Sequence, residues 1–149
     1  MFFKNFYLIK PMQVSKAYLD KLSYQVIGAA IEVHKTLGPG LLEKVYHKCL
    51  CKELSLRGIK FKSEKTIDLE YKGEKLDIDL KCDFIIEDCL IVEIKSVKEM
   101  NPLFEAQVLG YMKLLKIGKG LLINFKTTNI FYSGQKTFVN EYYELLPDV

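Results

Sequence analysis

Two acidic residues and a lysine stand at spacings that suit chemistry on a β-sheet. Glu93 and Lys95 are two residues apart, so both side chains point to the same face of a strand. Asp83 belongs to the preceding strand. If Glu87–Cys89 makes a three-residue turn, Asp83 lies directly opposite Glu93, whereas a two-residue turn puts them on opposite faces. We therefore expect two carboxylates and an ammonium group to converge.

This combination of groups favours a site for a divalent cation. Two neighbouring carboxylates repel each other, and a cation relieves that repulsion. Hard oxygen ligands suit Mg²⁺ or Mn²⁺, which keep several waters for chemistry on a phosphate. Lys95 would orient or deprotonate the attacking water, or neutralise charge on the phosphate. The alternative is a solvated ion pair between Glu93 and Lys95, but the surrounding apolar residues indicate a largely buried strand.

The elements before the site are predicted to be two helices. Apolar residues recur at helical spacing from Leu22 to Leu37, which predicts a helix that begins near Ser15 or Tyr18 and ends at Gly38. A second helix is expected over about 41–57.

Three strands should follow, because the apolar period changes to two. They are expected over 59–71, 74–86 and 89–96, with a turn at Lys72-Gly73 between the first two. Alternation in the second strand places Asp77, Asp79 and Asp83 on one face. Asp77 and Asp79 could bind a second cation, but we favour edge-strand charges that discourage aggregation.

A third helix of about sixteen residues is predicted to begin at Asn101-Pro102 and to end at Gly118, with Gln107 and Tyr111 one turn apart. A buried strand over 120–125 follows, and 129–132 and 137–143 are expected to form further strands or an ordered tail. The order α-α-β-β-β-α-β-(β) predicts one mixed α/β domain over residues 1–149, with a largely antiparallel sheet.

The ordered set of motifs resembles a known nuclease superfamily. Asp83, Glu93-Ile94-Lys95 and Gln107–Tyr111 are similar to the D…E-x-K…Q-x-x-x-Y pattern of PD-(D/E)XK nucleases, in particular the RecB and lambda-exonuclease branch. Upstream, Gly40–Tyr46 matches the G-x-x-E-x-x-Y signature of the GxxExxY protein family. The likeness spans about residues 22–132. It departs at Lys81, where an arginine is expected; lysine keeps the charge without the bidentate fork.

The resemblance implies a restriction-endonuclease-like αβββαβ core, preceded here by an extra helix, and a metal-dependent nuclease site. Asp83 and Glu93 would be metal ligands with the Ile94 carbonyl, and Glu43 would complete the acidic cluster. Lys95 would be the catalytic lysine. Lining the site, Gln107 and Tyr111 would touch the substrate or fix Glu93 and Lys95.

Several single residues keep two interpretations. Glu43 also suits a solvated first helical turn, where the helix dipole favours an acid. His34 or His47 could reach the metal, although a lone histidine more often packs or caps a helix. Tyr111 could be a core aromatic residue with a hydrated hydroxyl.

Charge, cysteine content and hydropathy indicate what the protein binds and where in the cell it is expected. The net charge of +3 combines +7 over residues 1–66, −6 over 67–110 and +2 over 111–149. Its 22 basic residues include one arginine, Arg57, so we expect lysine contacts with nucleic-acid phosphates and little base reading.

The cysteines and the first residues predict the location of the protein. There are four cysteines and no C-x-x-C pair, which predicts free thiols in the cytoplasm. Residues 1–10 contain no unbroken apolar run, so no signal peptide is expected. No apolar run is long enough for a membrane helix, so no membrane partner is expected.

We therefore expect a Mg²⁺- or Mn²⁺-dependent phosphodiesterase that acts on nucleic acid, on DNA rather than RNA. Lysines that could contact phosphates are Lys35, Lys44, Lys48 and Lys52. The alternative is a catalytically silent module of the nuclease fold that binds nucleic acid or a protein. A third possibility is a purely structural domain. Because the chain is close to a minimal core, a homodimer or a protein partner could supply substrate choice.

Overall fold

The computed structural model describes residues 14–149, except for the side chains of residues 77–79. The first thirteen residues, and the predicted roles of Asp77 and Asp79, therefore lie outside the described part of the chain. The elements follow one another in the order α1 (Lys16–Leu37), α2 (Glu43–Leu56), β1 (Phe61–Tyr71), β2 (Glu74–Ile86), β3 (Leu90–Lys95), α3 (Pro102–Leu115), β4 (Lys119–Asn124), α4 (Ile130–Ser133), β5 (Gln135–Val139) and α5 (Glu141–Glu144).

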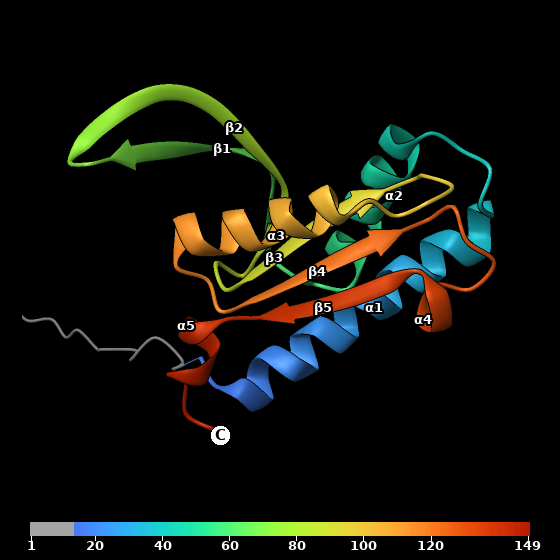
Figure 1. Ribbon diagram of the computed structural model, residues 1–149. Coiled ribbons are helices and arrows are strands. Elements are labelled where there is room, and N and C mark those ends of the chain that lie inside the picture. The colour runs from blue at the N-terminus through green and yellow to red at the C-terminus, as the bar shows by residue number, and fades with distance from the viewer. Residues whose placement is uncertain (1–13) are drawn as a thin grey trace, which may run out of the picture.

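The five strands form one mixed sheet in the order β1-β2-β3-β4-β5 (Figure 1). Neighbouring strands are antiparallel except β3 and β4, which are parallel and are joined through α3. The segment from α2 to β4 has the expected αβββαβ order, and α1 is the expected extra helix. The predicted fold class is therefore confirmed.

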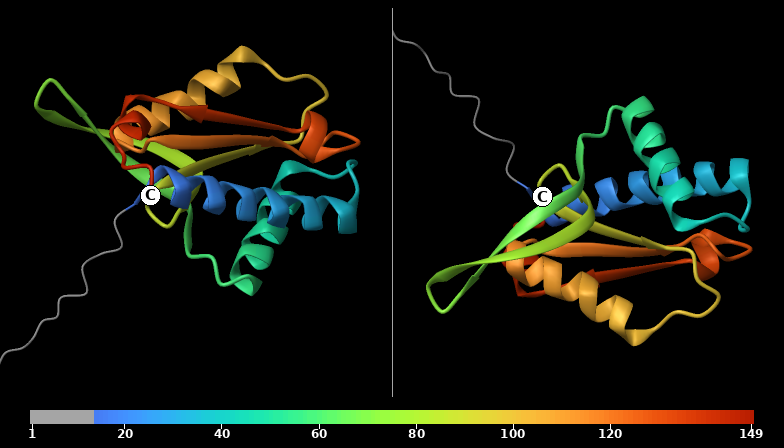
Figure 2. Two further views of the ribbon diagram at one scale, coloured as in Figure 1. Left: turned by 90° about the horizontal axis from the view of Figure 1, so that it is seen from below. Right: turned by 90° about the horizontal axis from the view of Figure 1, so that it is seen from above.

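Helices cover both faces of the sheet. In Figure 2, α1 and α2 lie on one side of the strands and α3 lies on the other. Each face has its own apolar core: Phe84, Val92 and Ile94 pack with residues of α1 and α2, whereas Ile91 and Leu122 pack with residues of α3. The site residues lie where these layers meet the end of β3.

Local sequence explains most helix boundaries. The Ser15 hydroxyl accepts the Tyr18 N–H at 3.1 Å and caps α1, and Gly38 ends the helix with a positive φ of 75°, which glycine adopts without strain. Asn101 caps α3 by accepting the Leu103 N–H at 2.8 Å, and Pro102 occupies the first turn, where no N–H is needed.

The last third of the chain differs from the expected strands and helix end at three places. Lys116 ends α3 in the left-handed conformation, with φ of 57°, so Gly118 is not the cap. Residues 130–133 form α4 rather than a strand, because the Asn129 side chain accepts the Tyr132 N–H at 3.0 Å and caps a helical turn. Of the expected strand over 137–143, only its first part is extended, as β5, and α5 follows.

The alternation of β2 breaks beside Asp83. Cys82 and Phe84 should share a face, yet Cys82 packs with α3 and Phe84 with α1 and α2. Opposite the break, Glu64 has a positive φ of 51°. The ladder between β2 and β3 ends at Phe84 and Val92, so the rest of the β1–β2 hairpin projects beyond the sheet (Figure 1). The predicted alternation of side chains along this strand is therefore interrupted at Asp83.

The described residues include no helix that is both long and apolar enough to cross a membrane. The four cysteines are free thiols.

Candidate functional site

Asp83 and Glu93 contact each other across β2 and β3. The turn between the strands has three residues, and Phe84 lies opposite Val92, which is the register that brings Asp83 to Glu93. The Asp83 N–H donates to Glu93 Oε1 at 2.9 Å. In return, the Ile94 N–H donates to Asp83 Oδ2 at 3.0 Å. The two carboxylates thus replace main-chain ladder bonds where the strands begin to separate.

The Lys95 side chain is held by α3. Its Nζ donates to Gln107 Oε1 at 3.3 Å and lies 4.6 Å from the centre of the Phe104 ring. Gln107 Nε2 donates to the Tyr111 hydroxyl at 3.3 Å, and that hydroxyl donates to the Lys81 carbonyl at 2.9 Å. This chain of hydrogen bonds connects the end of β3 to the base of the projecting hairpin. Gln107 therefore contacts Lys95, and Tyr111 contacts Gln107.

Glu43 reaches the same region as the first residue of α2. The loop before it is held by Tyr46, whose buried hydroxyl donates to the Gly38 carbonyl and accepts the Leu41 N–H at 3.0 Å. Ser96 ties the loop to the end of β3, because its hydroxyl donates to the Leu41 carbonyl at 2.9 Å. Tyr46 and Ser96 therefore fix the point at which α2 begins.

Charge interactions connect four residues that we call the carboxylate–lysine cluster: Glu43, Asp83, Glu93 and Lys95. Burial and the charge of Asp83 raise the pKa of Glu93 to about 8, and Glu93 is only 2% exposed. Partial desolvation and Asp83 also raise the pKa of Glu43, while Lys95 opposes that change. Both shifts arise first from desolvation and then from the Asp83 charge.

The two histidines have different positions. His47 Nε2 lies 3.3 Å from the Asp83 carbonyl oxygen and 3.1 Å from Ser63 Oγ, and the ring packs on Phe84. His34 instead donates from Nε2 to the Thr127 carbonyl at 2.7 Å. His47 therefore borders the carboxylates, whereas His34 fastens the segment after β4.

Sequence reasoning did not find Ser96 or Asn124. The buried Asn124 side chain accepts the Val97 N–H at 3.0 Å and donates to the Val97 carbonyl at 2.8 Å. It thereby fixes the chain just after Lys95. An asparagine at the end of an otherwise apolar strand was the available signal, because a buried amide needs partners.

Comparison with protein families decides the affiliation. A model of the PD-(D/E)XK nuclease superfamily matches residues 20–136. The chain belongs to this superfamily. No curated protein and no solved structure matches it.

Membership in the PD-(D/E)XK nuclease superfamily assigns the chain to proteins with nuclease-type phosphodiester hydrolysis. Nucleases of the superfamily generally use divalent metal ions. The matched region contains all four residues of the cluster, and also Gln107 and Tyr111 beside it.

The donor set fits a cation only in part. Asp83 and Glu93 offer hard oxygen atoms, and a cation would favour the ionised form of Glu93, whose pKa is raised first by burial and then by the Asp83 charge. Among the described residues, however, no group of three or more histidine, cysteine, aspartate or glutamate side chains is arranged to hold a metal ion. The predicted convergence of three acids is therefore limited to a close pair, with Glu43 near it.

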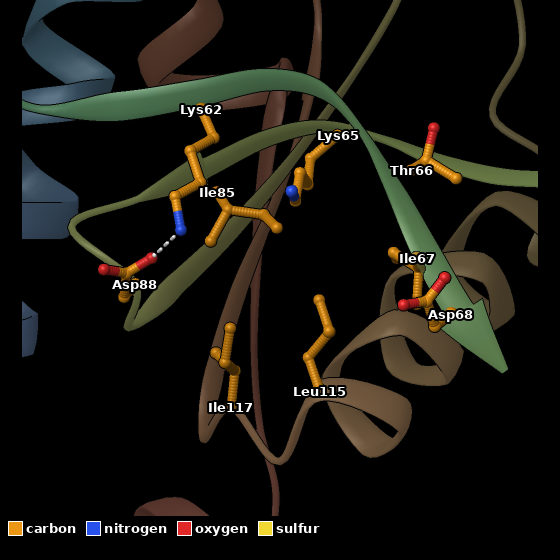
Figure 3. A pocket seen from close by; sticks show the side chains of 9 residues that line it. All are labelled: Lys62, Lys65, Thr66, Ile67, Asp68, Ile85, Asp88, Leu115 and Ile117. Atoms are coloured by element: carbon orange, nitrogen blue, oxygen red, sulfur yellow. Dashed lines mark hydrogen bonds and ion pairs between the residues drawn. The ribbon is translucent and has the colours of Figure 1, made fainter. Parts of the chain in front are cut away.

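A cavity of about 390 Å³ lies apart from this cluster, between the β1–β2 hairpin and the end of α3 (Figure 3). The Lys62–Asp88 ion pair of 2.8 Å stands at one side, and isoleucine and leucine side chains line the other. None of the predicted site residues lines it; its lining is Lys62, Lys65, Thr66, Ile67, Asp68, Ile85, Asp88, Leu115 and Ile117. This cavity does not contribute to the carboxylate–lysine cluster.

Proposed function

We propose that this protein hydrolyses phosphodiester bonds of nucleic acid, DNA rather than RNA, with Mg²⁺ or Mn²⁺ as cofactor. The observation that carries the proposal is the reciprocal contact of Asp83 and Glu93, with Lys95 two residues further along β3. Glu93 is buried against the partly buried Asp83, which is costly for a purely structural role, and superfamily membership supplies the chemistry that would use this pair.

The oxygen atoms of Asp83 and Glu93, together with the Ile94 carbonyl, would hold the cation, and Glu43 would complete its surroundings. When bound, the cation lowers the pKa of a water molecule and neutralises charge on the scissile phosphate. Binding needs the ionised form of Glu93, so the raised pKa of this residue makes loading easier as the pH rises.

The other residues position the reacting groups. Lys95 presents hydrogen-bond donors to the attacking water or to a phosphate oxygen, and its ammonium charge stabilises the negative charge that develops in the transition state. Gln107 keeps the Lys95 ammonium from moving away, and Tyr111 anchors Gln107 through the Lys81 carbonyl. Attack in line would leave a 5′-phosphate on the product.

We also propose that the chain belongs to the GxxExxY family within the superfamily, and to its RecB and lambda-exonuclease branch. The support is structural as well as sequential. The glutamate of the motif, Glu43, begins α2 beside Asp83, and its tyrosine, Tyr46, holds the preceding loop. The glutamate of the motif thus lies beside the carboxylate pair, and the tyrosine of the motif fixes the loop before it.

One observation favours the alternative of a catalytically silent binding module. Within the described residues no ready-made group of three metal ligands exists, and backbone N–H groups already occupy an oxygen of Asp83 and of Glu93. Such a module would bind nucleic acid or a protein partner, as a monomer or a homodimer, without cutting.

Cleavage assays separate the two functions. Plasmid and single-stranded DNA and RNA are incubated with Mg²⁺ or Mn²⁺ and wild type, Glu93→Ala or Lys95→Ala. Glu70→Gln and Lys113→Ala are controls, because both residues are exposed and no described hydrogen bond or ion pair connects either side chain to the cluster. We expect cleavage by wild type and both controls only. No cleavage with either ion, or equal cleavage by all proteins, rejects the nuclease and favours the binding module.

A further inference from the structure

A row of three lysines runs along α2 from the carboxylate–lysine cluster. Lys44, Lys48 and Lys52 are spaced four residues apart, so they share one face of the helix. The buried row of α2, Tyr46, Leu50 and Leu54, is offset by two residues and lies about 200° around the helix axis. The lysine row therefore faces away from the core, and all three side chains are exposed.

Among the described residues, Lys44, Lys48 and Lys52 have no acidic partners, in contrast to the basic side chains that form ion pairs. Lys62, Lys119 and Lys136 each form an ion pair with a carboxylate. For Lys44, Lys48 and Lys52, no salt bridge or side-chain hydrogen bond is found within residues 14–149 as described. Their charges are free to attract a polyanion, and the row begins one residue after Glu43, next to the cluster.

We infer that the lysine row binds the phosphate backbone of duplex DNA and leads it to the cluster. This inference rests on the proposed function, because it names the form of nucleic acid that the site receives. The row is about 12 Å long, comparable to three phosphate steps of about 3.4 Å along one strand.

The side chains around the row favour a duplex over a single strand. Proteins that bind single strands stack bases on exposed aromatic rings, but the aromatic residue of α2, Tyr46, is fully buried. Base reading is also not supported, because Arg57 donates to Glu53 Oε2 at 2.7 Å. The exposed side chains of the row itself carry positive charge, which recognises a regular phosphate backbone.

The test measures how binding depends on salt. A short DNA duplex and one of its strands are titrated by fluorescence anisotropy in EDTA, between about 50 and 200 mM salt. Wild type is compared with Lys44→Gln/Lys48→Gln/Lys52→Gln. The matched control is Lys21→Gln/Lys113→Gln/Lys116→Gln, which removes the same charge from exposed lysines on α1 and at the end of α3. Glutamine and lysine have similar helix propensities, and circular dichroism verifies the fold of each variant.

For the α2 variant we expect the slope of log affinity against log salt to decrease in magnitude by about 2 to 3 for the duplex, since each phosphate contact contributes about 0.9. The control should retain the wild-type slope to within about one contact. Equal losses in both variants, or an unchanged slope in the α2 variant, overturn the inference. Tighter binding of the single strand than of the duplex by wild type also overturns it.

The two proposals fail separately. Because EDTA prevents metal-dependent cleavage, a selective slope loss in the α2 variant supports the lysine row even if wild type proves to cut no nucleic acid. Conversely, cleavage by wild type with no slope change in the α2 variant leaves the nuclease in place and overturns the lysine row.

Discussion

Asp83 and Glu93 are joined by a hydrogen bond in which the main chain of Asp83 donates to the side chain of Glu93 at 2.9 Å. The Asp83 carboxylate accepts the N–H of the residue that follows Glu93. Each acid thus positions the other, and the site geometry depends on the register of β2 and β3 rather than on a flexible loop.

Glu93→Gln should change the pH dependence of stability in the metal-free protein. The pKa of Glu93 is raised to about 8 in the folded state, from an ordinary value of 4.5. Between these values the folded protein keeps a proton that the unfolded chain releases, so stability falls as the pH rises from about 4.5 through about 8. The glutamine variant lacks this loss. Urea denaturation of both proteins in EDTA at pH 5 and pH 8 measures it, and parallel pH profiles would contradict the prediction.

Gln107→Ala should lower cleavage by about 10- to 100-fold, because Lys95 loses the acceptor that positions it. The expected effect is on kcat more than on KM. Gln107→Glu keeps an acceptor oxygen for the ammonium group and should restore part of the rate. Gln25→Ala, an exposed glutamine of α1, is the control. A KM effect without a kcat effect would instead place Gln107 in substrate binding.

Tyr46→Phe should destabilise the protein by about 1–3 kcal/mol, because the Leu41 N–H and the Gly38 carbonyl lose their buried partner. The change should also reduce cleavage, since the loop that places Glu43 becomes looser. Tyr132→Phe removes a hydroxyl from a residue that is 84% exposed and should alter stability by less than about 0.5 kcal/mol. Denaturation curves compare the two, and equal effects would show that the Tyr46 hydroxyl does not hold the loop.

Gly110→Ala should stabilise the protein by about 0.5–1 kcal/mol. Gly110 lies inside α3, and a Cβ atom there meets nothing within 4 Å, so alanine gains helix propensity without a clash. Gly118→Ala provides the contrast, because its Cβ would stand 2.6 Å from the Tyr143 main-chain nitrogen and must displace backbone. Thermal denaturation should move in opposite directions for the two variants. A destabilised Gly110→Ala protein would mean that α3 is distorted by the added methyl group.

Much of the site could be predicted because strand parity depends on local sequence. A three-residue turn places Asp83 against Glu93, and helical spacing places Gln107 and Tyr111 on one face. The break between Cys82 and Phe84 could not be predicted in the same way. It arises from tertiary structure, where the hairpin leaves β3 and bends with a positive φ at Glu64.

The remaining errors also have a physical origin. Residues 130–133 are rich in β-formers, but the Asn129 side chain caps a helical turn there. The contacts of Ser96 and Asn124 join segments far apart in the chain, so local spacing does not identify their partners, although the position of Asn124 in an apolar strand indicates that its amide needs some. The expectation that Glu43 completes the acidic cluster came from the family resemblance. The residues around Glu43 also fit a solvated first helical turn.

The β1–β2 hairpin bends at Asp83, next to the point where β2 separates from β3. Beyond Phe84, towards the hairpin tip, β2 has no ladder pairs with β3 in the described part of the chain. The Tyr111 hydroxyl donates to the Lys81 carbonyl, two residues from Asp83. The position of the Asp83 carboxylate relative to Glu93 therefore depends on two anchors of β2: the ladder with β3 that ends at Phe84, and the hydrogen bond from Tyr111 to the base of the hairpin.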